Sequence, residues 1–530
     1  MKNMKISFQL KNDFTKSLPG DSDTTNTPRQ VYNACYSFVE PKKPSNPSLI
    51  HASLDLAEEM GITKDQLYSQ DFLNIFSGKQ VMVNTQPYAM CYGGHQFGNW
   101  AGQLGDGRAI NLGEIEHHDQ RWQLQLKGAG PTPYSRQADG LAVLRSSIRE
   151  HLCSEAMHYL GVPTTRSLSL VLTGDRVLRD IMYDGHPAYE KGAIVCRAAP
   201  SFIRFGNFQI FAARRDFKNL KILTDYTINE YFPHLSHLDP KISYLQFFQD
   251  VVNTTIDMVI HWNRVGFVHG VMNTDNMSIH GLTIDYGPYG WLDGYDHLWT
   301  PNTTDRHQRR YRFGHQGYIA LWNLYQLANS LFLLIEESQP LEAILEQAQA
   351  DYKIKHSNMM AEKLGFNQSL SGDEDLIVEL EELLQLHETD MTIFFRNLAQ
   401  FDENNYSEKL EEIPAYLTEA FYEPLLLKEE HNVAWLDWLD KYRNRLDSEN
   451  QSPAARSKKM NSVNPKYVLR NYMAQLAIDD ADKGDYELIK SLAEILKKPY
   501  DEQPEAAQWF VKRPDWARDK IGCSMLSCSS

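Results

Sequence analysis

Hydrophobic and polar residues alternate over residues 122–127, WQLQLK, as they do in a β-strand with one buried face. The segment before it, 93–114, is dense in glycine, and residues 192–196 form another short apolar run. We therefore predict a strand, a glycine turn and a strand within 93–114, then a strand that ends at Lys127. A further strand is predicted at 192–196.

Elsewhere apolar residues recur every three or four positions, which is the helical period. This pattern covers residues 142–160, where Gly161 and Pro163 follow, and residues 244–262, where Gly266 follows. Glycine and proline in these positions are typical of helix ends. Both segments are therefore predicted to be helices.

The second half of the chain also has a helical pattern. Residues 317–335 are apolar on nearly every side, which predicts a helix at the centre of a lobe. Beyond residue 336 the sequence is acidic, with a further amphipathic stretch at 373–401. A polar linker is predicted at 448–465 and a last helix at 466–477.

Composition limits what these elements can belong to. The chain has 530 residues, 42% hydrophobic and 11% aromatic, which suffices for two lobes with extensions. A formal net charge of −16 argues against a nucleic-acid-binding surface. The six cysteines are scattered, as in cytosolic proteins. No stretch reaches the ~18 consecutive apolar residues of a membrane span, so we expect a cytoplasmic protein that binds neither membranes nor nucleic acids.

The segment 265–292 carries the most informative motif. His269 is followed seven residues later by Asn276, and Asp285 begins an Asp-Tyr-Gly triplet. This spacing matches the catalytic loop and metal-binding triplet of protein kinases. The position of the kinase catalytic aspartate is Val271, which cannot accept a proton or bind a metal. Ordinary γ-phosphoryl transfer through this position is therefore excluded.

The glycine-dense segment and Lys127 resemble the nucleotide-binding part of a kinase small lobe, where backbone N–H groups and one ammonium contact phosphates. Without the lysine, tight hairpins that need positive φ explain the glycines equally well. Glu150 stands where a kinase-like fold places the partner of that lysine. The alternative is a capping box with Ser147, but the apolar pattern already begins at Val143, which favours the ion pair.

Two arginines flank a predicted turn that follows the strand at 192–196. Arg197 and Arg204 could hold a polyphosphate through bidentate hydrogen bonds. The alternative is that they are solvated or form structural salt bridges.

The most distinctive segments are YGGHQFGNWAGQLGDGRA, LKGAGPTPYSR, ADGLAVLRSSIREHLCSEAMHYLG, RAAPSFIRFGNF, GVMNTDNMSI and IDYGPYGWLD. Together they closely resemble the SelO family (selenoprotein O, called YdiU in bacteria). The resemblance covers most of residues 85–335. It implies a pseudokinase that binds ATP in a reversed orientation and transfers AMP to Ser, Thr or Tyr hydroxyls of proteins, with Mg²⁺ or Mn²⁺.

The resemblance also implies residue roles. Asp275 would be the catalytic base, and Asn276 and Asp285 would hold the metal. Glu150 would support the lysine, and Asp285 would also face the nucleotide. The remaining nucleotide-binding positions would be Gly105, Gly107, Arg108, Lys127, Asp139, Gly140, Arg197 and Arg204.

The implied fold is α+β, protein-kinase-like and bilobal, with a mainly β small lobe, a helical large lobe and a helical C-terminal extension. We expect an N-terminal extension at 1–80, the small lobe at 81–225, the large lobe at 226–360 and the extension at 361–530. The protein is expected to be monomeric.

Three other functions are compatible with some of these motifs. A metal-dependent kinase would keep the fold and the metal, but Val271 argues against it. An inactive nucleotide-binding scaffold would have no use for the full set of Lys127, Glu150, Asn276 and Asp285. UMP transfer from UTP stays open.

One departure from the family concerns redox control. In the family, a cysteine after the Asp-Tyr-Gly motif can pair with one near the C-terminus. Residues 290–308 contain no cysteine, and Pro301 stands in that place, whereas Cys528 remains. The sequence therefore argues against a disulfide switch of this design.

Overall fold

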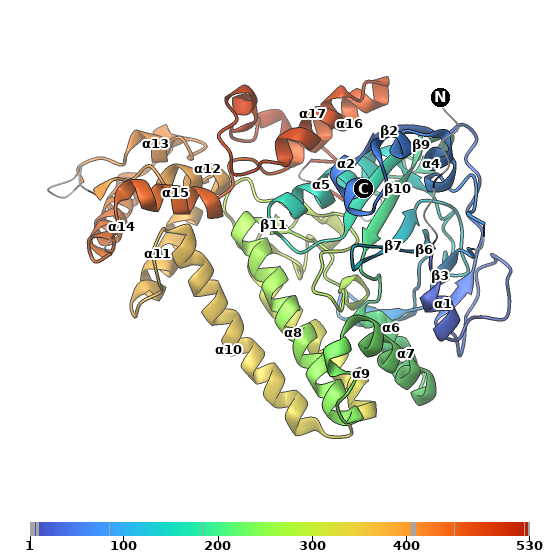
Figure 1. Ribbon diagram of the computed structural model, residues 1–530. Helices are drawn as coiled ribbons and strands as arrows, with labels where there is room; N and C mark the ends of the chain where they lie inside the picture. The colour runs from blue at the N-terminus through green and yellow to red at the C-terminus, as the bar shows by residue number, and fades with distance from the viewer. Residues whose placement is uncertain are drawn as a thin grey trace.

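The computed structural model describes residue 6 and residues 10–83, 85–183, 185–403, 410–449, 451–523 and 525–527. It is a mixed α/β protein with an antiparallel sheet and a helical C-terminal region (Figure 1). The sheet is built from the N-terminal part of the chain, and the long helices of the middle lie below it in this view. Cys528 lies outside the described residues.

An eight-stranded antiparallel sheet holds the first part of the site. Its central strands β7 and β10 pair so that Val195 lies opposite Lys127, which confirms the strands predicted at 122–127 and 192–196. Two of its strands come from the first 80 residues. The order is β1 (Tyr36–Phe38), β3 (Tyr88–Met90), β6 (Ala109–His117), β7 (Gln120–Lys127), β10 (Ala188–Ala199), β9 (Arg166–Arg179) and β2 (Ser48–Ala52), with β8 (Ala142–Val143) also paired to β10.

The glycine-dense segment forms a separate two-stranded hairpin of β4 (Gly93–Gln96) and β5 (Asn99–Gln103). The predicted strand, glycine turn and strand are therefore confirmed. β4 packs against helix α6 (Phe205–Ala213) and the short helix η2 (Thr274–Asn276). This hairpin thus connects the sheet to the loop that carries the kinase-like motif.

Helix α5 (Leu144–Tyr159) packs across β9 and β10. It begins directly after Val143, whose side chain makes no capping bond, so Ser147 lies inside the helix. The capping-box alternative for Ser147 and Glu150 is therefore wrong. The helix instead places Glu150 over the sheet, where the side chain is buried.

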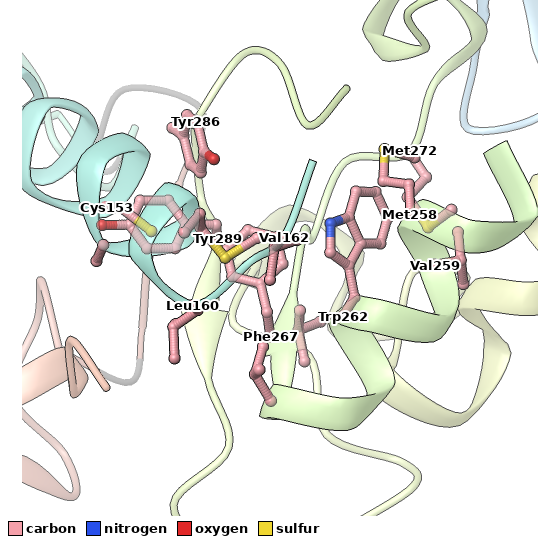
Figure 2. Close-up of a cluster of buried hydrophobic side chains, with 14 of the residues drawn as sticks. Cys153, Leu160, Val162, Met258, Val259, Trp262, Phe267, Met272, Tyr286 and Tyr289 are labelled. Atoms are coloured by element: carbon pink, nitrogen blue, oxygen red, sulfur yellow. The ribbon is translucent and has the colours of Figure 1, made fainter. Parts of the chain in front are cut away.

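The loop with the motif leaves the end of a long helix. Helix α8 (Pro240–Val265) ends at Gly266, whose φ of 76° is left-handed. The loop then runs between two short paired strands, β11 (Phe267–Val268) and β12 (Gly290–Trp291). Figure 2 shows Trp262 of α8 and Phe267 in one apolar cluster with Tyr289 and Cys153, so the base of the loop packs against α5.

Helix α9 (Gln316–Ile335) packs on α8 and α6, as expected for a helix at the centre of a lobe, but one of its faces is exposed. Tyr318, Tyr325 and Phe332 are exposed, because no described element covers that face. Among the described residues, Phe313–Ile335 is the segment long and apolar enough to cross a membrane, and half of its most apolar stretch is buried inside the protein. Core helices of soluble proteins share these properties. Helices α7 (Phe217–Tyr231) and α10 (Ser338–Lys363) complete this region.

The C-terminal region is helical over much of its length. The prediction of a linker at 448–465 is therefore wrong for the residues at its centre. Residues Pro453–Val463 form helix α15, since Ser452 caps the helix start and Arg456 is buried against Glu403. Helices α16 and α17 pack on α5 (Figure 1). The C-terminal helices are α11 (Asp373–Leu386), α12 (Met391–Leu398), α13 (Ala415–Thr418), α14 (Glu429–Asp447), α16 (Asn471–Lys483) and α17 (Glu487–Leu496), and the N-terminal ones are α1 (Asp13–Ser17), α2 (Leu54–Glu59), α3 (Lys64–Leu67) and α4 (Gln70–Phe76).

Candidate active site

A cavity of about 690 Å³ lies where the sheet, the segment 134–141 and the motif loop meet. Val271 lines it, so an uncharged side chain stands where a kinase has its catalytic aspartate. Glu150 and Arg204 lie behind the cavity wall. The predicted residues that line the cavity are Gly105, Gly107, Arg108, Lys127, Asp139, Gly140, Arg197, Asp275, Asn276 and Asp285.

The predicted ion pair between strand and helix is present. Lys127 Nζ lies 2.6 Å from Glu150 Oε2, and both side chains are buried. Burial lowers the pKa of Lys127, and the negative charge of Glu150 opposes this effect. The pair therefore fixes an ammonium group at the cavity wall.

Asp285 is held by both predicted phosphate-binding arginines. Arg197 Nη1 lies 2.6 Å from Asp285 Oδ1 and 3.3 Å from Glu150 Oε1, and Arg204 pairs with Asp285 Oδ2. Burial alone would raise the pKa of Asp285, but the nearby positive charges of Arg204 and Arg197 hold it well below its usual range. Asp285 is therefore a carboxylate whose two oxygens both contact guanidinium groups.

Asp275 has a different environment from Asp285. Its carboxylate is buried, and Gln96 Nε2 donates a hydrogen bond to Oδ2 at 3.2 Å. Oδ1 has no hydrogen-bond partner among the described residues. Gly94 leaves the room for this carboxylate, because a Cβ there would lie 2.7 Å from Oδ1. Asp275 therefore lines the cavity with a carboxylate that is held lightly, by one side-chain hydrogen bond.

Burial raises the pKa of Asp275 to about 6, against the opposing effect of the hydrogen bond from Gln96. A base must be deprotonated to act, so the rate should rise as pH increases through about 6 and level off above it. We expect this profile in the initial rates of any reaction that uses Asp275 as its base, measured between about pH 5 and pH 8 at saturating substrate. A rate that is flat over this range, or falls as pH rises, would contradict Asp275 as the base.

Hydrogen bonds hold the motif loop in place. His269 Nε2 lies 2.8 Å from the carbonyl oxygen of Ile284, and the His269 ring stacks on Trp262. Asn302 Nδ2 donates to the Gly270 carbonyl at 3.0 Å, and Tyr311 Oη donates to Asn273 Oδ1 at 2.6 Å. The loop is therefore held at three positions by residues outside it or at its far end.

Asn276 and Asp285 are compatible with a divalent cation. Asn276 Nδ2 donates to the Val271 carbonyl at 2.9 Å, an interaction that leaves its amide oxygen available. The described residues contain no cluster of three or more His, Cys, Asp or Glu side chains that could hold a metal. Mg²⁺ commonly binds through one or two protein oxygens together with substrate phosphates. The donor set fits a cation that arrives with a nucleotide.

The predicted glycines are required by packing at the cavity wall. A Cβ on Gly105, whose φ is 78°, would lie 2.4 Å from the Tyr134 ring. A Cβ on Gly140 would lie 2.2 Å from the Gly130 carbonyl oxygen. Gly107 likewise passes close to the backbone of Tyr134. These glycines let the segment 134–141 close over the cavity.

Several lining residues were not predicted from the sequence. Arg179 pairs with the predicted residue Asp139 at 2.7 Å, across the cavity wall. Gln96 contacts Asp275, and Asp106 is buried and accepts a hydrogen bond from Met90 N at 2.9 Å. Gln96 and Asp106 belong to the glycine-dense segment, which was a usable signal. Arg179 comes from β9, and no local pattern marks it.

Comparison with known proteins places this geometry in context. The profile of the family described as "Protein adenylyltransferase SelO" matches residues 23–497. The chain is 61% identical over 530 residues to "Protein nucleotidyltransferase YdiU" of Flavobacterium johnsoniae, with 100% of each chain covered. It is 54% identical over 540 residues to the protein of that name from Rhodopirellula baltica, covering 99% of this chain and 100% of the relative. For the Azoarcus sp. relative the identity is 52% over 520 residues, with 98% and 99% covered.

Proposed function

Because this chain belongs to the SelO family of protein adenylyltransferases, we propose that it transfers AMP from ATP to Ser, Thr or Tyr hydroxyls of proteins through the cavity at Asp275. The nucleotide lies reversed relative to a kinase, with its α-phosphate beside Asp275. Strands β3 to β10 belong to a kinase-like small lobe at 81–225, and helices α8 to α10 frame the large lobe at 226–360. The region 361–530 is a helical extension, and the protein is a cytoplasmic monomer.

The position of the acidic residue in the motif loop carries this proposal. Val271 stands where a kinase has its catalytic aspartate, and this chain has an aspartate four residues later, at Asp275. Val271 lines the cavity but has no group that can accept a proton. Asp275 also lines the cavity, and its Oδ1 has no hydrogen-bond partner among the described residues. Asp275 takes the proton of the acceptor hydroxyl while the hydroxyl oxygen bonds to the α-phosphorus. The bond from the α-phosphorus to the bridging oxygen breaks, and pyrophosphate leaves.

Arg197, Arg204 and Asp285 then have matched roles. The Asp285 carboxylate pairs with both guanidinium groups inside the protein. A metal–nucleotide complex offers new partners in the cavity, because the cation can bind Asp285 and Asn276 while the terminal phosphates bind Arg197. Arg204 stays behind the cavity wall on the carbonyl oxygen of Asp275. Mg²⁺ or Mn²⁺ would shield the charge of the phosphates. When these partners change, no buried charge is left unpaired, so the free-energy cost of the rearrangement stays low.

Replacing Arg197 with alanine tests the orientation of the nucleotide. If the guanidinium holds the β- and γ-phosphates, ATP binding should weaken at least about tenfold more than AMP binding, as expected for a charge-assisted bidentate contact. Isothermal titration calorimetry with both nucleotides measures the difference. Arg176→Ala, an exposed arginine of the same sheet, is the control. Equal losses for ATP and AMP would show that Arg197 does not touch the terminal phosphates.

Intact-mass spectrometry tests the function itself. The protein is incubated with an acceptor protein, a divalent cation and an equal mixture of ATP and UTP. We expect the acceptor to gain the mass of an adenylyl group. Gain of a uridylyl group would establish the UTP alternative, and gain of a phosphoryl group would establish a kinase.

A further inference from the structure

The segment 305–312, DRHQRRYR, is strongly basic in an acidic protein. It holds four arginines and one aspartate in a chain of net charge −16. Asp305 is buried, and its carboxylate accepts hydrogen bonds from the backbone N–H of Arg310 and of Tyr311, at 3.0 and 2.7 Å. Its carboxylate is therefore turned inward, and the charged side chains that reach the surface are those of the arginines.

The arginines of this basic segment have no carboxylate partner within the described part of the chain. Arg306 and Arg309 are exposed, and Arg310 and Arg312 are partly exposed. Arg312 donates to the Arg309 carbonyl, and Arg306 donates to the ring of His307. Arg310 lies over the Trp322 ring at 4.6 Å, and its buried Nε has no hydrogen-bond partner among the residues described. Unpaired guanidinium groups gathered on one surface can bind carboxylates in a bidentate manner.

The basic segment is attached directly to the catalytic loop. Tyr311 Oη donates to Asn273 Oδ1 at 2.6 Å and accepts a hydrogen bond from Phe97 N at 2.9 Å. Asn273 stands two residues before Asp275, and both Asn273 and Phe97 line the cavity. The arginines thus lie on a segment that contacts two residues of the cavity wall.

The arginines of the basic segment do not serve the nucleotide from inside the cavity. None of Arg306, Arg309, Arg310 and Arg312 is among the described residues that line it. An aromatic surface continues from them, because the His95 ring lies 5.5 Å from Trp322 and 5.1 Å from Trp100, which is 40% exposed. Aromatic side chains with arginines are typical of surfaces that bind polypeptides.

We propose that the basic segment is the docking site for the acceptor polypeptide and selects hydroxyls flanked by Asp or Glu residues. This inference rests on the proposed function, since it specifies the substrate class of the same site. An acidic polypeptide is repelled by the rest of this acidic protein, so a local positive surface is needed to bring it to Asp275. A nucleic acid fits less well, because its longer negative backbone would meet the net negative surface around the segment.

Binding of a matched peptide pair tests this docking site. One fluorescent peptide carries a central tyrosine flanked by glutamates, and the other has glutamine at each of those positions. Anisotropy at low salt is measured for the full-length protein, for Arg306→Gln/Arg309→Gln, and for the control Lys64→Gln/Lys79→Gln, which removes two exposed charges elsewhere on the surface. We expect the acidic peptide to bind wild type at least about fivefold more tightly than the neutral one.

The preference should disappear in the arginine variant, persist in the lysine variant and weaken with added salt. Equal binding of the two peptides to wild type, or an unchanged preference in the arginine variant, would overturn the docking site. Tighter binding of a single-stranded oligonucleotide than of the acidic peptide, lost in the arginine variant, would also overturn it and assign the segment to nucleic acid.

AMP incorporation into the same peptides separates the two proposals. With both correct, the acidic peptide has the lower KM, and the arginine variant raises that KM while kcat and the KM for ATP stay unchanged. If the acidic peptide binds selectively but neither peptide nor any acceptor protein gains AMP, the proposed function fails and the docking site stands. If both peptides gain AMP with the same KM, the docking site fails and the function stands.

Discussion

Replacing Asp275 with alanine is expected to lower AMP transfer about 10²-fold or more, the usual effect of removing a general base. ATP affinity should change little. Arg204 Nη1 donates a hydrogen bond to the backbone carbonyl oxygen of Asp275 at 2.9 Å. Replacing the side chain of Asp275 leaves that contact in place. Initial rates with labelled ATP and calorimetric affinity for ATP measure the two effects separately.

Asp275→Asn is the matched control, because it keeps the shape of the side chain and can still accept the hydrogen bond from Gln96. If Asp275 served only to stabilise the turn at 273–276, the asparagine variant would keep its activity. Loss of activity in both variants, with the melting temperature of Asp275→Asn unchanged, supports a base. Full activity in Asp275→Ala would exclude this role.

Val271→Asp gives a second test of the same assignment. It restores an acid where a kinase has its base, but a reversed nucleotide keeps the γ-phosphate away from it. The variant should therefore not transfer the γ-phosphoryl group. Efficient γ-phosphoryl transfer by Val271→Asp would require the reversed orientation to be abandoned.

Asp285→Asn is expected to abolish measurable AMP transfer. A metal ion stabilises transition-state charge by several kcal/mol, and losing that stabilisation corresponds to about 10²-fold or more in rate. Asparagine can still accept a hydrogen bond from Arg197 or Arg204, so it disturbs the buried network less than alanine. Alanine would leave two buried guanidinium groups without their shared partner. Rates measured against cation concentration, with circular dichroism to confirm the fold, check this expectation.

A higher cation concentration should not restore full activity to Asp285→Asn, since the charge that binds the ion is gone. Wild-type rates with an unchanged dependence on Mg²⁺ or Mn²⁺ would remove Asp285 from the metal site. Asp296→Asn is a suitable control. It makes the same change at an aspartate that follows the Asp-Tyr-Gly triplet in the chain but does not line the cavity.

Local patterns predicted the parts of the site that depend on spacing along the chain. The strand that ends at Lys127, the helix that carries Glu150 and the loop from His269 to Asp285 each have a periodicity or a motif. The 2.6 Å pair of Lys127 and Glu150 follows once the helix packs on the sheet.

Contacts between distant segments were beyond sequence reasoning. Arg179 reaches Asp139 from β9, and Gln96 reaches Asp275 across 179 residues of chain. The polar sequence of Pro453–Val463 predicts a linker, whereas in the structure this segment is a helix that packs on α10 and buries Arg456 and Met460. Tertiary packing decides such cases over local composition.

The same limit applies to α9. Its composition predicted a helix at the centre of a lobe, but Tyr318 and Tyr325 are exposed because no described element lies over them. A count of apolar residues cannot show how many neighbours a helix has. The docking site proposed at 305–312 likewise depends on the contact of Tyr311 with Asn273, which is 38 residues away in the chain.

The position of the transferred phosphorus tests the central claim most directly. The protein is incubated with an acceptor protein, a divalent cation and ATP labelled at either the α- or the γ-phosphorus, with Asp275→Asn in parallel. We expect label from the α-phosphorus in the acceptor, label from the γ-phosphorus in released pyrophosphate, and neither in the Asp275→Asn reaction. Label from the γ-phosphorus in the acceptor would contradict AMP transfer and the reversed nucleotide together.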